Sequence, residues 1–126
     1  MSRLLVVAAG TVQLALCACA APALEPEQRA LLMSPGAEVR EELRRAVSDS
    51  FHGAPVVLAD DALTMSSELI VERTPVRDAS GRILSGREED RPQHFHLVTA
   101  AGACVLVHDA SGRRTILKAA HCSPAP

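Results

Sequence analysis

Histidine is the residue type in this sequence best suited to chemistry. His94 and His96 flank Phe95, so on a β-strand their imidazoles would point to the same face. His108 lies on the next expected strand, and a His-x-His pair with a third histidine nearby can bind Zn²⁺ or Cu²⁺. The competing interpretation, which we favour, is an exposed strand whose Phe95 turns into the core. His94, His96 and His108 are therefore candidate metal ligands, while the sequence predicts no cofactor.

The other reactive residue types form no catalytic pattern. A hydrolase needs a nucleophile, a base and a group that orients the base, and the sequence has no nucleophile elbow and no paired-carboxylate signature. Carboxylates do cluster in the charged segment Ser85–Gln93, which is either a solvated loop or a recognition loop on a rigid sheet. The candidate recognition residues are Arg87, Glu88, Glu89, Asp90 and Arg91. We predict no enzymatic activity.

The first residues have the layout of a bacterial secretory signal peptide. Arg3 precedes an apolar run, Leu4–Leu16, that is too short to span a membrane comfortably. The tetrapeptide Leu16–Cys19 resembles a lipobox, which would place a diacylglyceryl group on Cys19. Cleavage after an Ala-x-Ala sequence, at Ala18–Ala20 or Ala21–Ala23, is the alternative and would leave a soluble periplasmic or secreted protein. Because the residue after Cys19 is not Asp, a lipidated protein would face the periplasm from the outer membrane.

The remaining cysteines predict a disulfide. Cys17 and Cys19 belong to the signal region, so Cys104 and Cys122 are the two thiols of the mature domain. In an oxidising compartment one remaining pair most simply forms a disulfide. Two free thiols, or zinc held by both cysteines with His121, are the alternatives.

Composition limits the possible partners and the size of the core. The chain has 126 residues, a formal net charge of −2 and only two aromatic side chains, Phe51 and Phe95. A basic stripe with interleaved aromatic residues is absent, which argues against nucleic acid as a partner. A core built from Val, Leu, Ile and Ala is marginal in so small a domain, so a covalent cross-link would be useful.

One amphipathic helix and several short strands must position these residues. Ser34 and Pro35 offer a helix start, Gly53 offers a stop, and apolar residues between them recur at helical spacing, which predicts a helix over Gly36–Phe51. Its expected buried stripe is Val39, Leu43, Ala46, Val47 and Phe51. Short β-branched or alternating runs predict the strands Pro55–Ala59, Ser67–Thr74, His94–Ala100, Ala103–Asp109 and Arg114–Ala119.

The pentapeptide DASGR occurs twice, at Asp78–Arg82 and at Asp109–Arg113. Asp can accept a backbone hydrogen bond at the first position of a turn, and Gly supplies a left-handed residue at its end. Both copies therefore predict hairpins with a type I turn and a glycine bulge. The flanking sequences differ, so the repeat indicates shared turn chemistry rather than a duplicated unit.

The second half of the chain, IVERTPVRDASGRILSGRE followed by HFHLVTAAGACVLVHDASGRRTILKAAHC, resembles a group of small exported proteins of Gram-negative bacteria, among them expected lipoproteins. The resemblance implies no known activity. It agrees with the export and disulfide predictions, which come from the residues themselves.

Together these observations predict an α+β fold, in which one amphipathic helix packs on a mostly antiparallel sheet of four or five strands with one disulfide. The expected organisation is a signal peptide over residues 1–18, a tether or short helix over 19–34 and a single domain over 35–126. The predicted function is a non-enzymatic envelope lipoprotein that binds an unknown envelope protein and meets the membrane only through its lipid anchor. The alternatives are a periplasmic metal-binding protein that uses the histidines and an inhibitor of an envelope hydrolase.

Overall fold

The computed structural model describes residues 26–73, 77–84 and 91–126. In chain order its regular elements are one helix and six strands. They are β1 (Gln28–Leu32), α1 (Ala37–Ser50), β2 (Glu68–Val71), β3 (Gln93–Ala100), β4 (Ala103–His108), β5 (Arg114–Leu117) and β6 (Cys122–Pro124). Among these residues, no helix is long and apolar enough to cross a membrane.

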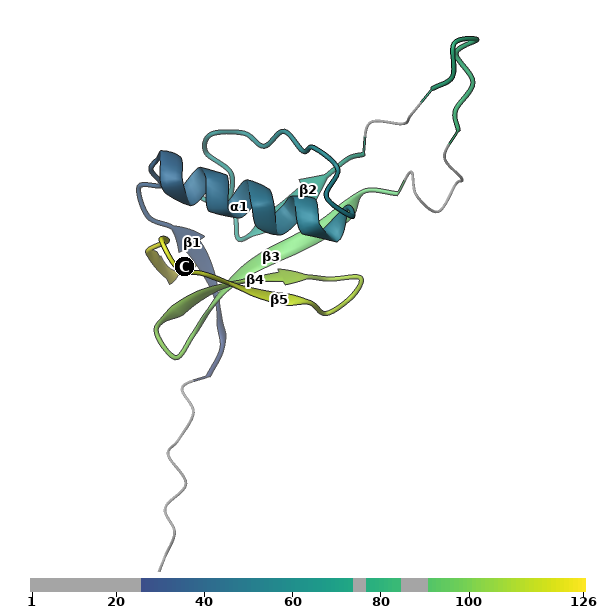
Figure 1. The fold of residues 1–126 in the computed structure, drawn as a ribbon. Coiled ribbons are helices and arrows are strands. Elements are labelled where there is room, and N and C mark those ends of the chain that lie inside the picture. The colour runs from purple at the N-terminus through teal and green to yellow at the C-terminus, as the bar shows by residue number, and fades with distance from the viewer. Residues whose placement is uncertain (1–25, 74–76, 85–90) are drawn as a thin grey trace, which may run out of the picture.

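The strands form one antiparallel sheet in the order β5-β4-β3-β1-β6, with β2 also paired to β3. β3 is the central strand, because β4 pairs along one of its edges while β1 and β2 share the other. The helix α1 lies against one face of the sheet (Figure 1). The predicted α+β fold with a single helix is confirmed, with a slightly larger sheet than expected.

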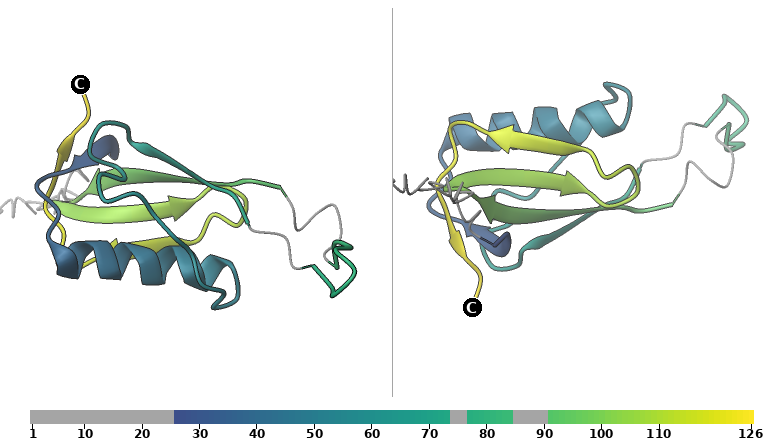
Figure 2. Two further views of the ribbon diagram at one scale, coloured as in Figure 1. Left: turned by 90° about the horizontal axis from the view of Figure 1, so that it is seen from above. Right: turned by 90° about the horizontal axis from the view of Figure 1, so that it is seen from below.

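The main core lies between α1 and the sheet. The helix buries the expected apolar stripe, and views from above and below show it lying on the β5 side of the sheet (Figure 2). On the sheet, Phe95, Leu97 and Leu117 are among the most completely buried side chains. Aliphatic residues supply nearly all the rest, so shape complementarity must replace the area that aromatic rings would bury.

The two ends of α1 differ from each other in how well the sequence predicts them. The N-cap is Gly36, which offers no side-chain hydrogen bond, and not the predicted Ser34, whose φ is +43°. At the other end Gly53 is a stop signal, as predicted. Its N–H donates to the Ser48 carbonyl oxygen at 2.9 Å, with His52 in the left-handed conformation between them. This is the 6→1 hydrogen bond of a Schellman cap.

Two predicted segments have a different structure. The stretch expected as a tether or short helix contains β1, a strand held between β3 and β6. Pro55–Ala59, predicted as a strand, pairs with no other strand and belongs to an irregular connection between α1 and β2. β1 was missed because it is short and its polar and apolar residues do not alternate cleanly.

Both DASGR copies form hairpins, but the turns are not the same. At the first copy, the Gly81 N–H donates to the Asp78 carbonyl oxygen at 3.0 Å and the Asp78 carboxylate accepts from the Ser80 and Arg82 N–H groups, as expected. At the second copy, the Gly112 N–H instead donates to the His108 carbonyl oxygen at 2.8 Å, so the turn starts one residue earlier. The closing bond expected between Gly112 and Asp109 is therefore absent there.

The reason for this difference is the position of Asp109. Its backbone N–H donates to the His94 carbonyl oxygen at 2.9 Å, which keeps Asp109 on the ladder with β3. Its carboxylate meets His96 and is therefore not used to close the turn. The Ser111 hydroxyl takes that role and accepts from the Arg113 N–H at 3.2 Å.

The predicted disulfide is present between Cys104 and Cys122, with Cα atoms 5.9 Å apart. It joins β4 to β6, which are separated by β3 and β1 in the strand order. The bond therefore ties the C-terminal strand to the middle of the sheet.

Candidate functional site

The three candidate metal ligands do not share a face of the sheet. His108 pairs with Phe95 in the ladder between β4 and β3, so it lies on the helix side, whereas His94 and His96 lie on the opposite side. The His108 ring stacks on Phe95 with centroids 4.7 Å apart. Its Nδ1 and Nε2 each lie 2.7 Å from a partner, the Ser111 hydroxyl and the Gln93 amide oxygen respectively. His108 is thus a core residue with both nitrogens hydrogen-bonded.

His96 has a carboxylate partner on the outer face of the sheet. Its Nδ1 lies 2.5 Å from an Asp109 oxygen, while His94 is solvent-exposed. Across the described ranges, no three His, Cys, Asp or Glu residues are grouped so that they could hold a metal ion. The geometry does not bring the predicted ligand set together.

Burial of His108 predicts a specific pH dependence of stability. Removal from water lowers the pKa of the His108 imidazole, because the charged form is disfavoured in the core. As the pH falls below about 6.5, the unfolded chain takes up a proton that the folded protein resists. The stabilisation contributed by neutral His108 is therefore present above this pH and is lost as the pH falls towards the lower folded pKa.

Chemical denaturation between about pH 7.5 and 5.5 tests this expectation. As the pH is lowered, the free energy of unfolding should decrease in the wild type and decrease less steeply in His108→Gln. The glutamine side chain stays neutral and can still form hydrogen bonds. Ile116→Ala, which removes an exposed side chain that does not titrate, is the control and should keep the wild-type dependence. Equal slopes for His108→Gln and the wild type would show that His108 does not titrate differently on folding.

Most of the predicted recognition loop lies outside the described residues. Arg87, Glu88, Glu89 and Asp90 belong to the range 85–90, and Cys19 belongs to 1–25, so neither the recognition loop nor the lipidation site has a structural description. Arg91 is described and exposed, beside a shallow hollow that is also lined by His94 and Asp109.

The open face of the sheet, opposite the helix, carries both polar and apolar side chains. Its apolar centre, Val98, Val105 and Val107, is buried. On the same side, the Arg114 guanidinium forms an ion pair with Glu27 at 2.5 Å and holds the pKa of the Glu27 carboxyl below its usual range. The same face also carries Ile70 and Ile116, which lie opposite His94 and Val105 in the ladders and are 56% and 58% exposed, less than the most exposed apolar side chains of the molecule.

The most exposed apolar side chains lie instead on the connection between α1 and β2, residues 51–67. Val57 is 96% exposed and Met65 is 86% exposed, more than any other large apolar side chain in the described chain. The connection is also longer than the ~12–15 residues usual for an irregular segment, and such segments are commonly functional. Buried Leu63 has a φ of +62°, a conformation that costs energy for a branched side chain.

Two hollows border this connection. One, of about 230 Å³, lies between Leu58–Ala62 and the first half of α1, where Arg40 and Arg44 form part of the rim. The other, of about 330 Å³, lies beside Ala54–Val57, with Phe51, Glu72 and Arg73 in its wall. Concave surface and exposed apolar surface thus occur in the same part of the molecule.

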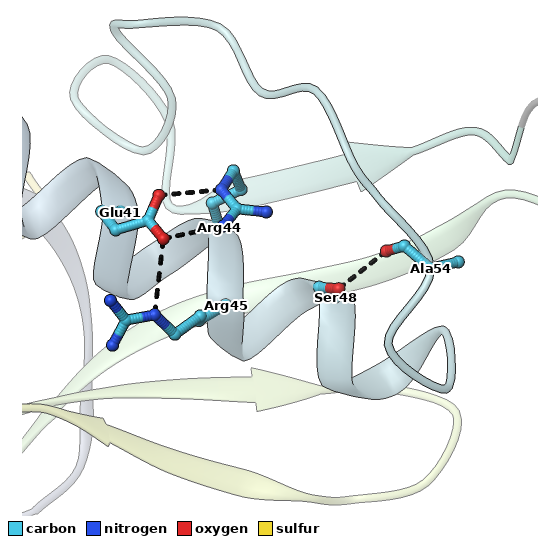
Figure 3. A network of polar contacts seen from close by, with 5 residues as sticks. All are labelled: Glu41, Arg44, Arg45, Ser48 and Ala54. Atoms are coloured by element: carbon cyan, nitrogen blue, oxygen red, sulfur yellow. Dashed lines mark hydrogen bonds and ion pairs between the residues drawn. The ribbon is translucent and has the colours of Figure 1, made fainter.

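Polar contacts from α1 hold the start of the connection in place. The Ser48 hydroxyl donates to the Ala54 carbonyl oxygen at 2.7 Å (Figure 3). Within α1 itself, Glu41 accepts from Arg44 and Arg45 one helical turn away. The bidentate Arg44 contact lowers the pKa of Glu41 to about 2. Farther along, the Leu32 N–H of β1 donates to the Leu63 carbonyl oxygen at 2.8 Å. The connection is irregular but anchored at several points.

Local sequence patterns do not single out this region as a candidate site. Pro55–Ala59 is predicted only as a strand, which the structure does not form. A useful signal was present, because Val57 and Met65 are large apolar residues in a stretch that also contains Asp60 and Asp61.

No protein-family model, curated protein sequence or solved structure matches the chain.

Proposed function

We propose that the mature chain is a protein-binding module of the bacterial cell envelope, and that it docks its partner through the connection of residues 51–67. The observation that carries this proposal is the exposure of Val57 and Met65 on one segment of a small domain. Exposed apolar side chains that are gathered with concave surface are typical of interaction sites. An envelope protein is the expected partner class.

The proposed location rests on the sequence and on the cross-link. The lipobox Leu16–Cys19 supports a lipid anchor on Cys19, and a disulfide between Cys104 and Cys122 suits an oxidising compartment. Intact mass spectrometry of the protein from its native envelope tests the anchor. A diacylated N-terminal Cys19 is the expected result, whereas an unmodified N-terminus after an Ala-x-Ala sequence would make the protein soluble.

Site-specific photocrosslinking in living cells tests the docking site. A photoreactive residue at Met65 should form a discrete crosslinked product with an envelope protein, and the additional change Val57→Asp should remove that product. The same photoreactive residue at Ile116, which is 58% exposed on β5, serves as the control and should form no such product. Equal crosslinking at both positions, or none at Met65, would contradict the proposal.

A further inference from the structure

The segment Pro55–Ala59 has the side-chain pattern of a β-strand without a strand to pair with. Pro55, Val57 and Ala59 are exposed, whereas Val56 and Leu58 are partly buried and pack against the main core. This alternation is the period of a strand with one face inward. It explains why the sequence predicts a strand here although the ladder is absent.

The backbone of this segment also lacks hydrogen-bond partners within the described chain. Within the described chain, the peptide N–H and C=O groups of Val56, Val57 and Leu58 take part in no hydrogen bond. The flanking carbonyl groups are occupied, since Ala54 accepts from Ser48 and Ala59 accepts from the Ala62 N–H. A short row of free donors and acceptors therefore lies between two anchored ends.

The free N–H and C=O groups of Val56–Leu58 would match the backbone of another extended chain. We propose that Pro55–Ala59 is a docking strand, which binds an extended peptide segment of the partner protein by β-strand addition. In this binding mode the main-chain hydrogen bonds supply affinity, and pockets beside the strand select alternate side chains. The hollows of about 330 and 230 Å³ at the two ends are suited to apolar side chains of such a peptide. The inference rests on the proposed docking role of the connection.

A second copy of this chain is a poorer occupant of the same strand. Antiparallel self-pairing centred on Val57 would place Pro55 opposite Ala59 at both ends. Pro55 has no N–H, so in that pairing its bond to the Ala59 carbonyl oxygen would be missing at each end, although the Ala59 N–H could still donate to the Pro55 carbonyl oxygen. Val56 and Leu58 of a second copy also pack against that copy's own core and cannot enter the hollows beside this strand, so the occupant we propose is a heterologous peptide.

Peptides selected from a phage-displayed library of random linear sequences provide the probe. We expect selection on the purified domain to enrich peptides with apolar residues at alternate positions. Amide hydrogen exchange followed by NMR then reports the binding mode. In the free domain the amides of Val56, Val57 and Leu58 should exchange quickly, and bound peptide should protect either Val57 or both of its neighbours, since alternate amides point to opposite edges.

Proline substitutions test the same ladder independently. Val57→Pro removes an N–H on one edge of the segment and Leu58→Pro removes one on the other, so one of the two should weaken peptide binding about tenfold. Val57→Thr and Leu58→Val keep the N–H groups and should bind as the wild type does. If Leu58→Pro fails to fold, the exchange measurement decides.

Three results would overturn the inference. The first is binding of the selected peptides to both proline variants at wild-type strength. The second is peptide binding without protection of any amide in Val56–Leu58. If the photocrosslink at Met65 persists in that case, the proposed docking at the connection is retained and only the proposed β-strand addition is wrong. The third is a concentration-dependent dimer of the free domain that Val57→Pro abolishes, which would identify a second copy as the occupant.

Discussion

Replacing Phe95 by alanine is expected to lower the free energy of unfolding by about 3–5 kcal/mol. Phe95 is 2% exposed on the central strand, beneath α1, and its ring stacks on His108. The loss combines the transfer free energy of the ring with a cavity that the paired strands β2, β3 and β4 cannot easily close. Since small domains have ~5–15 kcal/mol of stability, the variant should be at the edge of folding.

Chemical denaturation with matched variants checks this result. Phe95→Leu fills most of the volume and should cost clearly less than alanine does. Ile116 on β5 is 58% exposed, so Ile116→Ala should change the free energy of unfolding by less than about 1 kcal/mol. A Phe95→Ala protein as stable as Phe95→Leu would show that the core under α1 relaxes more freely than its burial indicates.

The parts of the fold that could be predicted are those whose own residues carry a repeating pattern. α1 has apolar residues at helical spacing, and β3, β4 and β5 have β-branched runs bounded by turn residues, so each element is visible locally. β1 and β6 pair with each other and are too short to show alternation. Their formation depends on contacts between distant parts of the chain, which a local pattern does not contain.

The same limit explains the outcome for the candidate sites. Whether His108 joins His94 and His96 depends on the register between β3 and β4, and a shift of one residue moves every side chain to the other face. The observed register pairs His108 with Phe95 and places it in the core. In Pro55–Ala59 the local pattern predicted a strand, and the segment does alternate between exposed and partly buried side chains, but pairing requires a neighbouring strand that the described chain does not supply. That mismatch is what makes the segment a candidate for binding.

Removal of the disulfide is expected to cost about 3 kcal/mol of stability, the entropic value for a closed loop of this length. The cysteines are 18 residues apart, and the variant Cys104→Ala/Cys122→Ala removes the covalent link between β6 and β4, with the short ladder to β1 as the remaining strand pairing of β6. Wild type measured with reductant should match the double variant, and the double variant itself should not respond to reductant. A double variant with wild-type stability would show that the strand contacts alone fix β6.

The effect should reach the proposed docking connection through β1. β6 pairs with β1, the Met33 N–H donates to the His121 carbonyl oxygen at 2.8 Å, and the neighbouring Leu32 N–H donates to Leu63. Loss of the cross-link should therefore speed amide exchange at Leu32 and Met33 before the domain unfolds globally. The Gly81 amide, in the separate hairpin at 77–84, is the internal control and should exchange at the same rate in both proteins. Because Leu63 anchors the connection, the disulfide would support partner binding as well as stability, so reduction should weaken capture of selected peptides.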